Sequence, residues 1–408
     1  MKRFLFYSIL ILSLGCSSTN EGKKGDPNFN NTGSFFSLDC GAMMKDYRIV
    51  PVSNFADSLE YVVLETTVSS MLGRVFDAQF TRDYIFIEHN GPLAQFDRKG
   101  KFLRLIGKVG RGPEEYNGMR AFSVDEVQRL IYIQANWARK ILVYSFEGEF
   151  VKSIDLNLDD RIIVWSRDSL FMCFSEPQIG NEEYVFREID SEGKRIQTVK
   201  NYSTWQDKAP FGRTNIYWGR NIFYRLNNQL HFKGEFNDTV YTYDSNYKII
   251  PKFYIDLKEY RLPANLRIER GPIHSIPPDF YWACVRETSR FIFIRYSTYA
   301  ANSSDTWALD EGYIYVDKKT GVYETIHNKN DKSGFINDLD GGPDFIPEYT
   351  NDSLAFHFIK SIDMKEFISS DNFLKSTPKY PEKKELLLNK MNELKESDND
   401  ILVIAKLK

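Results

Sequence analysis

The sequence predicts an all-β protein, a six-bladed β-propeller with a short C-terminal helix and a closing terminal strand. Three observations lead to this prediction: an aromatic content of 15%, a repeated hairpin unit, and a strand-like C-terminal segment. Aromatic and β-branched side chains fill the pleated surfaces of stacked antiparallel sheets, and this chain has 31 Phe and 24 Tyr. We therefore expect stacked sheets along most of the chain.

A repeated unit of short strands is visible in the first half of the chain. Residues 83–106 and 129–154 match almost position for position, apart from a two-residue insertion. Weaker copies begin near residues 169, 229, 291 and 353. Repeats of about 40 to 60 residues with several antiparallel strands are typical of a β-propeller, and six fit between residues 59 and 408. Tandem β-sandwiches are the alternative, but they would not repeat one hairpin at this period.

The turns of the repeat follow a pattern that has a physical reason. Asp97 precedes Gly100, and Asp190 precedes Gly193. Aspartate can accept hydrogen bonds from amides two residues on, and glycine adopts the left-handed conformation that short hairpin loops need. The fourth unit has Tyr247 in place of the glycine, so we expect a different or strained turn there.

The C-terminal segment predicts how the ring closes. Residues 381–395 read as a helix, with proline in the first turn and acidic residues ahead of basic ones, and its apolar stripe is expected to pack on the propeller. Residues 401–407 read as a strand that pairs with strands near the N-terminus of the domain. Such closure removes the open sheet edge that invites aggregation.

Charge excludes one class of function. The chain has 53 basic and 56 acidic residues, a formal net charge of −3, and no long basic block. It therefore lacks the electrostatic footprint of a nucleic-acid-binding protein.

The N-terminus predicts export. Lys2 and Arg3 are followed by an apolar run that is too short to span a bilayer, which predicts a signal peptide over residues 1–15. Cys16 follows Gly15, as at the cleavage site of a bacterial lipoprotein, although Ser13 stands where an aliphatic residue is usual. We therefore predict that Cys16 is lipidated, that residues 16–36 form a flexible tether, and that residues 37–408 form a single propeller domain. An ordinary signal peptide is the alternative.

Several stretches carry a resemblance to a known family: 59–66, 106–116, 237–241, 338–343 and 399–408. They resemble the six-bladed β-propeller lipoproteins of Bacteroidetes, relatives of NHL-like propellers. The resemblance implies a propeller held by its lipid at the outer membrane, on either the periplasmic or the surface side. It implies little about mechanism.

Motifs for cofactors and metals are missing from the sequence. The five histidines form no close pair with zinc-ligand spacing, so neither a metal nor a cofactor is predicted. The run 338–344 resembles a calcium loop only in its first residues, and a tight surface turn is favoured. His231 and His357 lie in strand patterns and are expected to be half-buried sheet residues.

The glycine-rich run 107–116 was compared with a phosphate-binding loop. It ends in a proline and two carboxylates, which would repel a phosphate, so a structural loop between blades is favoured. Arg111, Glu114 and Tyr116 remain candidates for a shared central pocket.

Long insertions predict the working face. Segments 111–116, 205–218, 267–282 and 298–307 hold four of the six tryptophans, and we expect at least three of them to meet on one rim. Tryptophans that cap blades are the alternative. The candidate binding residues are Arg111, Glu114, Tyr116, Arg213, Trp218, Arg270, His274 and Trp282.

The predicted function is that of a non-catalytic cell-envelope lipoprotein. It would bind a glycan, a peptide or another protein and, by analogy, serve an outer-membrane nutrient-import complex. The alternative is a glycan- or peptide-cleaving propeller enzyme with a central polar site.

Overall fold

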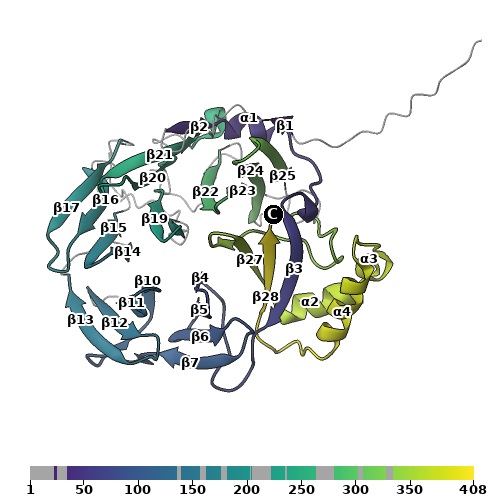
Figure 1. The fold of residues 1–408 in the computed structure, drawn as a ribbon, viewed down its shortest axis with the longest axis horizontal. Coiled ribbons are helices and arrows are strands. Elements are labelled where there is room, and N and C mark those ends of the chain that lie inside the picture. The colour runs from purple at the N-terminus through teal and green to yellow at the C-terminus, as the bar shows by residue number, and fades with distance from the viewer. Residues whose placement is uncertain are drawn as a thin grey trace, which may run out of the picture.

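The structure is a computed structural model that describes residues 23–24, 35–135, 139–156, 162–175, 182–202, 204, 222–234, 237–262, 280–301, 307–327 and 334–408. Six sheets, each with four antiparallel strands at its core, stand around a common axis as blades, which confirms the predicted six-bladed β-propeller (Figure 1). The predicted signal peptide lies outside the described residues. No helix in the described part of the chain has the length and hydrophobicity needed to cross a membrane.

Blades 1 to 3 are each built from four consecutive strands, with the first nearest the axis (Figure 1). Blade 1 consists of β4 (Asp77–Phe80), β5 (Tyr84–Glu88), β6 (Leu93–Asp97) and β7 (Phe102–Ile106). Blade 2 consists of β10 (Met119–Asp125), β11 (Leu130–Ala135), β12 (Lys140–Ser145) and β13 (Phe150–Asp155). Blade 3 consists of β14 (Ile162–Arg167), β15 (Leu170–Phe174), β16 (Tyr184–Ile189) and β17 (Arg195–Lys200).

Blades 4 and 5 follow the same plan, and each gains a short strand from the N-terminal segment. Blade 4 consists of β18 (Phe223–Leu226), β19 (Gln229–Phe232), β20 (Thr239–Tyr243) and β21 (Ile249–Ile255), with β2 (Phe36–Leu38) parallel to β21. Blade 5 consists of β22 (Trp282–Glu287), β23 (Phe291–Ala301), β24 (Trp307–Asp317) and β25 (Val322–His327), with β1 (Lys23–Lys24) at its edge. β1 belongs to the predicted tether, so part of the tether contacts the ring.

Short elements connect the blades and the N-terminal segment. They are α1 (Cys40–Met44), η1 (Val52–Asn54), β8 (Lys108–Val109), β9 (Glu115–Tyr116) and η3 (Lys258–Tyr260). β8 and β9 pair in parallel within the connection from blade 1 to blade 2.

Blade 6 closes the ring with strands from both ends of the domain. It consists of β26 (Tyr349–Thr350), β27 (Leu354–Ile359), β28 (Ile401–Leu407) and β3 (Ala56–Val63). β28 pairs with β3 from Ile401 opposite Val63 to Leu407 opposite Ala56. The predicted closing strand is therefore confirmed.

The hairpin turns have the predicted chemistry. Asp97 Oδ1 accepts the amides of Lys99 and Lys101, and Gly100 has a φ of +86°. The turn of the fourth unit keeps the same hydrogen bonds through Asp244, and Tyr247 takes a φ of +58°. The turn therefore has the same hydrogen bonds as the other units. It is strained, because a side chain in this conformation meets its own backbone.

Aromatic side chains fill the spaces between blades. Phe80 of blade 1 stacks on Phe356 of blade 6 with ring centroids 3.8 Å apart. Tyr132 of blade 2 stacks on Trp165 of blade 3 at 5.7 Å. Such contacts explain the high aromatic content, because every blade presents two faces that a neighbour must cover.

A helical insertion separates β27 from β28 and packs on the outer side of blade 6 (Figure 1). It contains α2 (Ser361–Ser369), α3 (Asp371–Lys375) and α4 (Pro381–Asn392). α4 is the predicted helix, and its Leu387 and Met391 are buried against blade 6. α2 and α3 were not predicted.

Candidate functional site

The ring has two faces that differ in their connections. Because neighbouring strands are antiparallel, the turns after the first and third strands of each blade lie on one face, named here the turn face. The connections between blades, and those after each second strand, lie on the opposite loop face. The helical insertion follows a second strand and so leaves the ring from the loop face.

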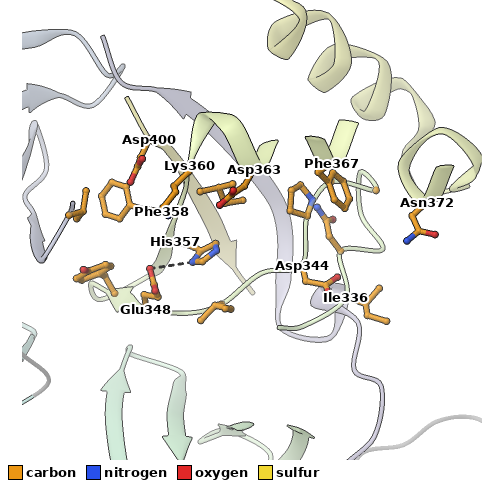
Figure 2. A pocket seen from close by; sticks show the side chains of 18 of the residues that line it. Ile336, Asp344, Glu348, His357, Phe358, Lys360, Asp363, Phe367, Asn372 and Asp400 are labelled. Atoms are coloured by element: carbon orange, nitrogen blue, oxygen red, sulfur yellow. Dashed lines mark ion pairs between the residues drawn. The ribbon is translucent and has the colours of Figure 1, made fainter. Parts of the chain in front are cut away.

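A cavity of about 1280 Å³ opens where blade 6, the segment before it and the helical insertion meet. Its wall combines acidic, basic, amide and aromatic side chains (Figure 2). The polar and aromatic ones are Arg74, Asn337, Asp344, Glu348, Tyr349, His357, Phe358, Lys360, Asp363, Phe367, Asn372, Ser376 and Asp400. A concave site with a few polar groups among apolar ones is the usual form of a ligand site.

One ion pair lies at the base of this cavity. Glu348 directly precedes β26, and His357 lies within the neighbouring β27. The two strands pair side by side, which brings His357 Nδ1 to 3.3 Å from Glu348 Oε2 (Figure 2). The side chain of Glu348 is 37% exposed and that of His357 is 14% exposed. Burial works to raise the pKa of Glu348, but the hydrogen bond and charge of His357 outweigh it and lower that pKa.

A second carboxylate has the opposite shift. Asp400 precedes β28, and burial raises its pKa. Asp363 and Glu348 add to this rise because like charges disfavour ionisation, whereas Lys360 opposes it. Figure 2 shows Asp400, Lys360 and Asp363 close together near the start of α2. The cavity thus holds one carboxyl that ionises readily and one that resists ionisation.

The cavity has the chemistry to bind a polar ligand. Its carboxylates, amide and ammonium groups can exchange hydrogen bonds with hydroxyls or peptide groups. Phe358 and Phe367 supply flat apolar surface beside them. Two carboxyl groups with opposite pKa shifts are also a property of acid–base sites. Among the described residues, no group of three or more side chains could hold a metal ion.

The glycine-rich run 107–116 is a loop between blades 1 and 2, with Arg111 and Glu114 exposed. Tyr116 is different: it is 2% exposed, donates a hydrogen bond to Ile106 O at 2.6 Å and accepts one from Leu93 N at 2.8 Å. Its hydroxyl is therefore held by blade 1, its ring lies 6.4 Å from that of Tyr144 in blade 2, and its part in binding stays a prediction.

Trp282 is also buried, and its part in binding stays a prediction. It is 5% exposed, in β22, so it packs within blade 5 rather than lining a rim. Arg213, Trp218, Arg270 and His274 lie outside the described residues.

The run 338–344 is not the surface turn that we expected. Asp340 is buried and accepts hydrogen bonds from Tyr61 Oη at 2.9 Å, Asn337 Nδ2 at 2.6 Å and Gly342 N at 3.0 Å. Burial raises its pKa. It thus anchors the segment that leads to the cavity, and Asp344 at the end of the run lines the cavity.

Sequence reasoning missed this cavity. Glu348 and Asp400 stand outside any motif, and they lie near each other because β26, β27 and β28 pair across a long helical insertion. His357 was predicted to be a half-buried sheet residue, which it is, but its strand pattern carried no sign of the cavity. The single available signal was the long departure from the repeat after residue 359.

Similar structures have the same architecture. A structure from Bacteroides fragilis, described as that of a proposed exported protein, matches with a TM-score of 0.64 and 18% identity, and the match covers 92% of this chain and 100% of that chain. A member of the DUF4221 family from Bacteroides vulgatus matches with a TM-score of 0.50 and 11% identity over 90% of this chain and 99% of that one. No curated protein matches. The model of a domain of unknown function, DUF4934, matches residues 35–406, so the chain belongs to that family.

Proposed function

We propose that this protein is a non-catalytic, lipid-anchored binding propeller of the cell envelope. Its ligand would be a glycan or a peptide held in the loop-face cavity between blade 6 and the helical insertion. The observation that carries this proposal is the cavity itself, about 1280 Å³ of space lined by charged, amide and aromatic side chains. That volume is large enough for several sugar or amino-acid units.

The proposed location rests on the N-terminal sequence. The charged start, the apolar run and the Gly15–Cys16 junction support export and lipidation. The Bacteroides fragilis structure that is described as a proposed exported protein agrees with this location. An outer-membrane nutrient-import complex is the partner we propose by analogy.

Replacing Cys16 tests the anchor. The Cys16→Ala protein should move from the membrane to the soluble fraction of lysed cells, because the acyl chains supply most of the binding energy. Cys40→Ala is the matched control, since Cys40 is buried and free. Cys16→Ala protein that stays with membranes as fully as the parent would show the anchor to be wrong, and protease treatment of whole cells would decide the side of the membrane.

Binding can be tested with a panel of oligosaccharides and peptides. We expect at least one class of ligand to bind the parent protein. Glu348→Gln and Asp400→Asn should each weaken this binding by tenfold or more. Glu147→Gln is the matched control, because this exposed residue pairs with Arg129 in blade 2. Binding that is equal in all variants would exclude the cavity as the site.

A specific observation also favours the alternative, a glycan- or peptide-cleaving enzyme. Glu348 and Asp400 have pKa values shifted in opposite directions, as the base and the acid of a hydrolase require. Incubation of the same panel with the protein, followed by mass spectrometry, separates the two functions. Cleavage that Asp400→Asn abolishes while binding persists would establish the enzyme and overturn the non-catalytic proposal.

A further inference from the structure

A second cavity lies on the propeller axis and opens toward the turn face. It has a volume of about 700 Å³ and receives residues from the innermost strand of all six blades. These include Ala78 of β4, Val124 of β10, Trp165 of β14, Arg225 of β18, Arg286 of β22 and Tyr349 of β26. It is distinct from the loop-face cavity, which lies at blade 6 and the helices.

Arg225 places a positive charge in the wall of this axial cavity. Its guanidinium donates to the carbonyls of Trp165 at 2.7 Å, Ser166 at 3.0 Å and Asn228 at 3.1 Å, and it lies 4.3 Å from the centre of the Trp165 ring. These contacts hold the side chain in place, and all three acceptors are uncharged carbonyls. Burial lowers its pKa to about 10, against the opposing charge of Asp125.

Arg98 is a second cationic residue in the same wall. It leaves the turn after β6 and lies 5.3 Å from the Phe356 ring centre and 5.9 Å from that of Phe80. Its Nη1 is shielded from solvent without a hydrogen-bond acceptor. Burial lowers its pKa, and Glu60 opposes this only through space.

Four other partly buried arginines of the described chain each pair with a carboxylate. The pairs are Arg48–Glu324, Arg167–Glu188, Arg290–Asp317 and Arg295–Glu311. Neither Arg98 nor Arg225 forms such a pair in the part of the chain that the structure describes. Burying a charge without a partner is costly, so a bound anion would relieve a cost that the four paired arginines do not carry.

The acidic residues of the axial cavity hold backbone amides instead. Glu126 accepts the amide of Arg82 at 2.8 Å, and Asp352 accepts that of Asn227 at 2.7 Å. Asp77 accepts the amide of Ala78 at 2.9 Å. The bonds of Glu126 and Asp352 tie together turns around the mouth, and they direct these two carboxylates to the backbone rather than to the two guanidinium groups.

We propose that the axial cavity binds a small anionic ligand, a carboxylate or a phosphate, through Arg98 and Arg225. Guanidinium groups recognise both oxyanions with paired hydrogen bonds. Phe80, Val164 and Leu354 line the same space and would contact the apolar part of the ligand. The bound anion would neutralise the charge that the protein leaves unpaired.

Titration calorimetry on the purified full-length protein, with inorganic phosphate and succinate at constant ionic strength, tests this site. We expect saturable one-to-one binding of at least one probe, and the stronger of the two identifies the oxyanion class. Arg98→Met should weaken binding by tenfold or more. Arg98→Lys, which keeps a positive charge, should retain part of it.

Arg129→Met is the matched control. Arg129 also lies over an aromatic ring, that of Phe146 at 4.9 Å, but it pairs with Glu147 and does not line the axial cavity. The Arg129→Met protein should bind the anion with the affinity of the parent protein. Asp400→Asn should also leave anion binding unchanged, so this test is independent of the loop-face proposal. A parent protein that binds neither probe, or an Arg98→Met protein that binds equally well, would overturn the inference.

Discussion

Blades 1 and 6 are both four-stranded antiparallel sheets, but the chain assembles them in two different ways. Blade 1 is one continuous run from Asp77 to Ile106, with short connections between its strands. Blade 6 takes β3 from the start of the domain and β28 from its end, and it accommodates three helices between β27 and β28. Blade 1 contributes a strand and a turn to the axial cavity that all six blades share, whereas the interrupted blade borders a cavity of its own on the loop face. The loop-face cavity thus lies where the chain departs from its repeat.

Removing the closing strand of blade 6 should have the largest effect on stability. Deletion of residues 400–408 exposes the edges of β3 and β27 and removes five buried side chains, Ile401, Leu402, Val403, Ile404 and Ala405. The loss should exceed the stability margin of about 5–15 kcal/mol of an ordinary domain. Urea denaturation and soluble yield measure it.

Deletion of Lys408 alone is the control for this truncation. It leaves the pairing of β28 with β3 in place and should retain the stability of the parent. A truncated protein that melts within a few degrees of the parent would show that blade 6 does not hold the ring closed.

The helical insertion should matter for both stability and binding. Met391→Ala removes a fully buried side chain between α4 and blade 6, and Met172→Ala removes one inside blade 3. Each should cost about 2–5 kcal/mol in urea denaturation. Only Met391→Ala should also weaken binding at the loop-face cavity. Equal binding by both variants would show that the insertion does not shape the site.

The junction of the two blades can be probed at a turn glycine. Gly100 in blade 1 and Gly148 in blade 2 occupy the same position of the repeat, with φ of +86° and +84°. A Cβ at Gly100 would lie 2.3 Å from Val63 O of blade 6, whereas at Gly148 the nearest atom is 3.4 Å away. Gly148→Ala should cost about 1–2 kcal/mol from backbone strain, and Gly100→Ala should cost more. Equal losses of stability in the two variants would mean that blade 6 moves to accommodate the added Cβ.

The same contrast explains what could be predicted from sequence. The hairpin turns follow from local residues, such as Asp97 and Gly100, and closure follows from one apolar strand at the end. Asp340 was misjudged, because its burial depends on Tyr61 almost 300 positions earlier. The cavity residues Glu348 and Asp400 come together through the pairing of β26, β27 and β28, and the helical insertion separates β27 from β28 in the sequence. Local chemistry is therefore readable, whereas sites built from distant segments are not.

The smallest expected effect concerns the pH dependence of blade 6. Asp400 has a pKa raised above its ordinary value of 3.8, chiefly by burial. Such a group costs the most stability above its folded pKa, and the cost fades as the pH falls from the folded pKa to the unfolded pKa. Asp400→Asn should therefore stabilise the protein at pH 7 and have no effect below about pH 3.8. Thermal melts at a series of pH values measure the difference.

Glu348→Gln should behave in the opposite way. The pKa of Glu348 is lowered from its ordinary value of 4.5. Its ionised form therefore contributes stability above the unfolded pKa, and this stability is lost as the pH falls through the folded pKa. The variant should lose stability at pH 7 and match the parent in acid, although partial exposure limits the size of the loss. Asp371→Asn, at an exposed pair with Lys375 on α3, should show neither trend. If Asp400→Asn and Glu348→Gln shift the melting temperature in the same direction at pH 7, the two carboxyl groups do not have opposed environments, and the support for an acid–base pair in this cavity is lost.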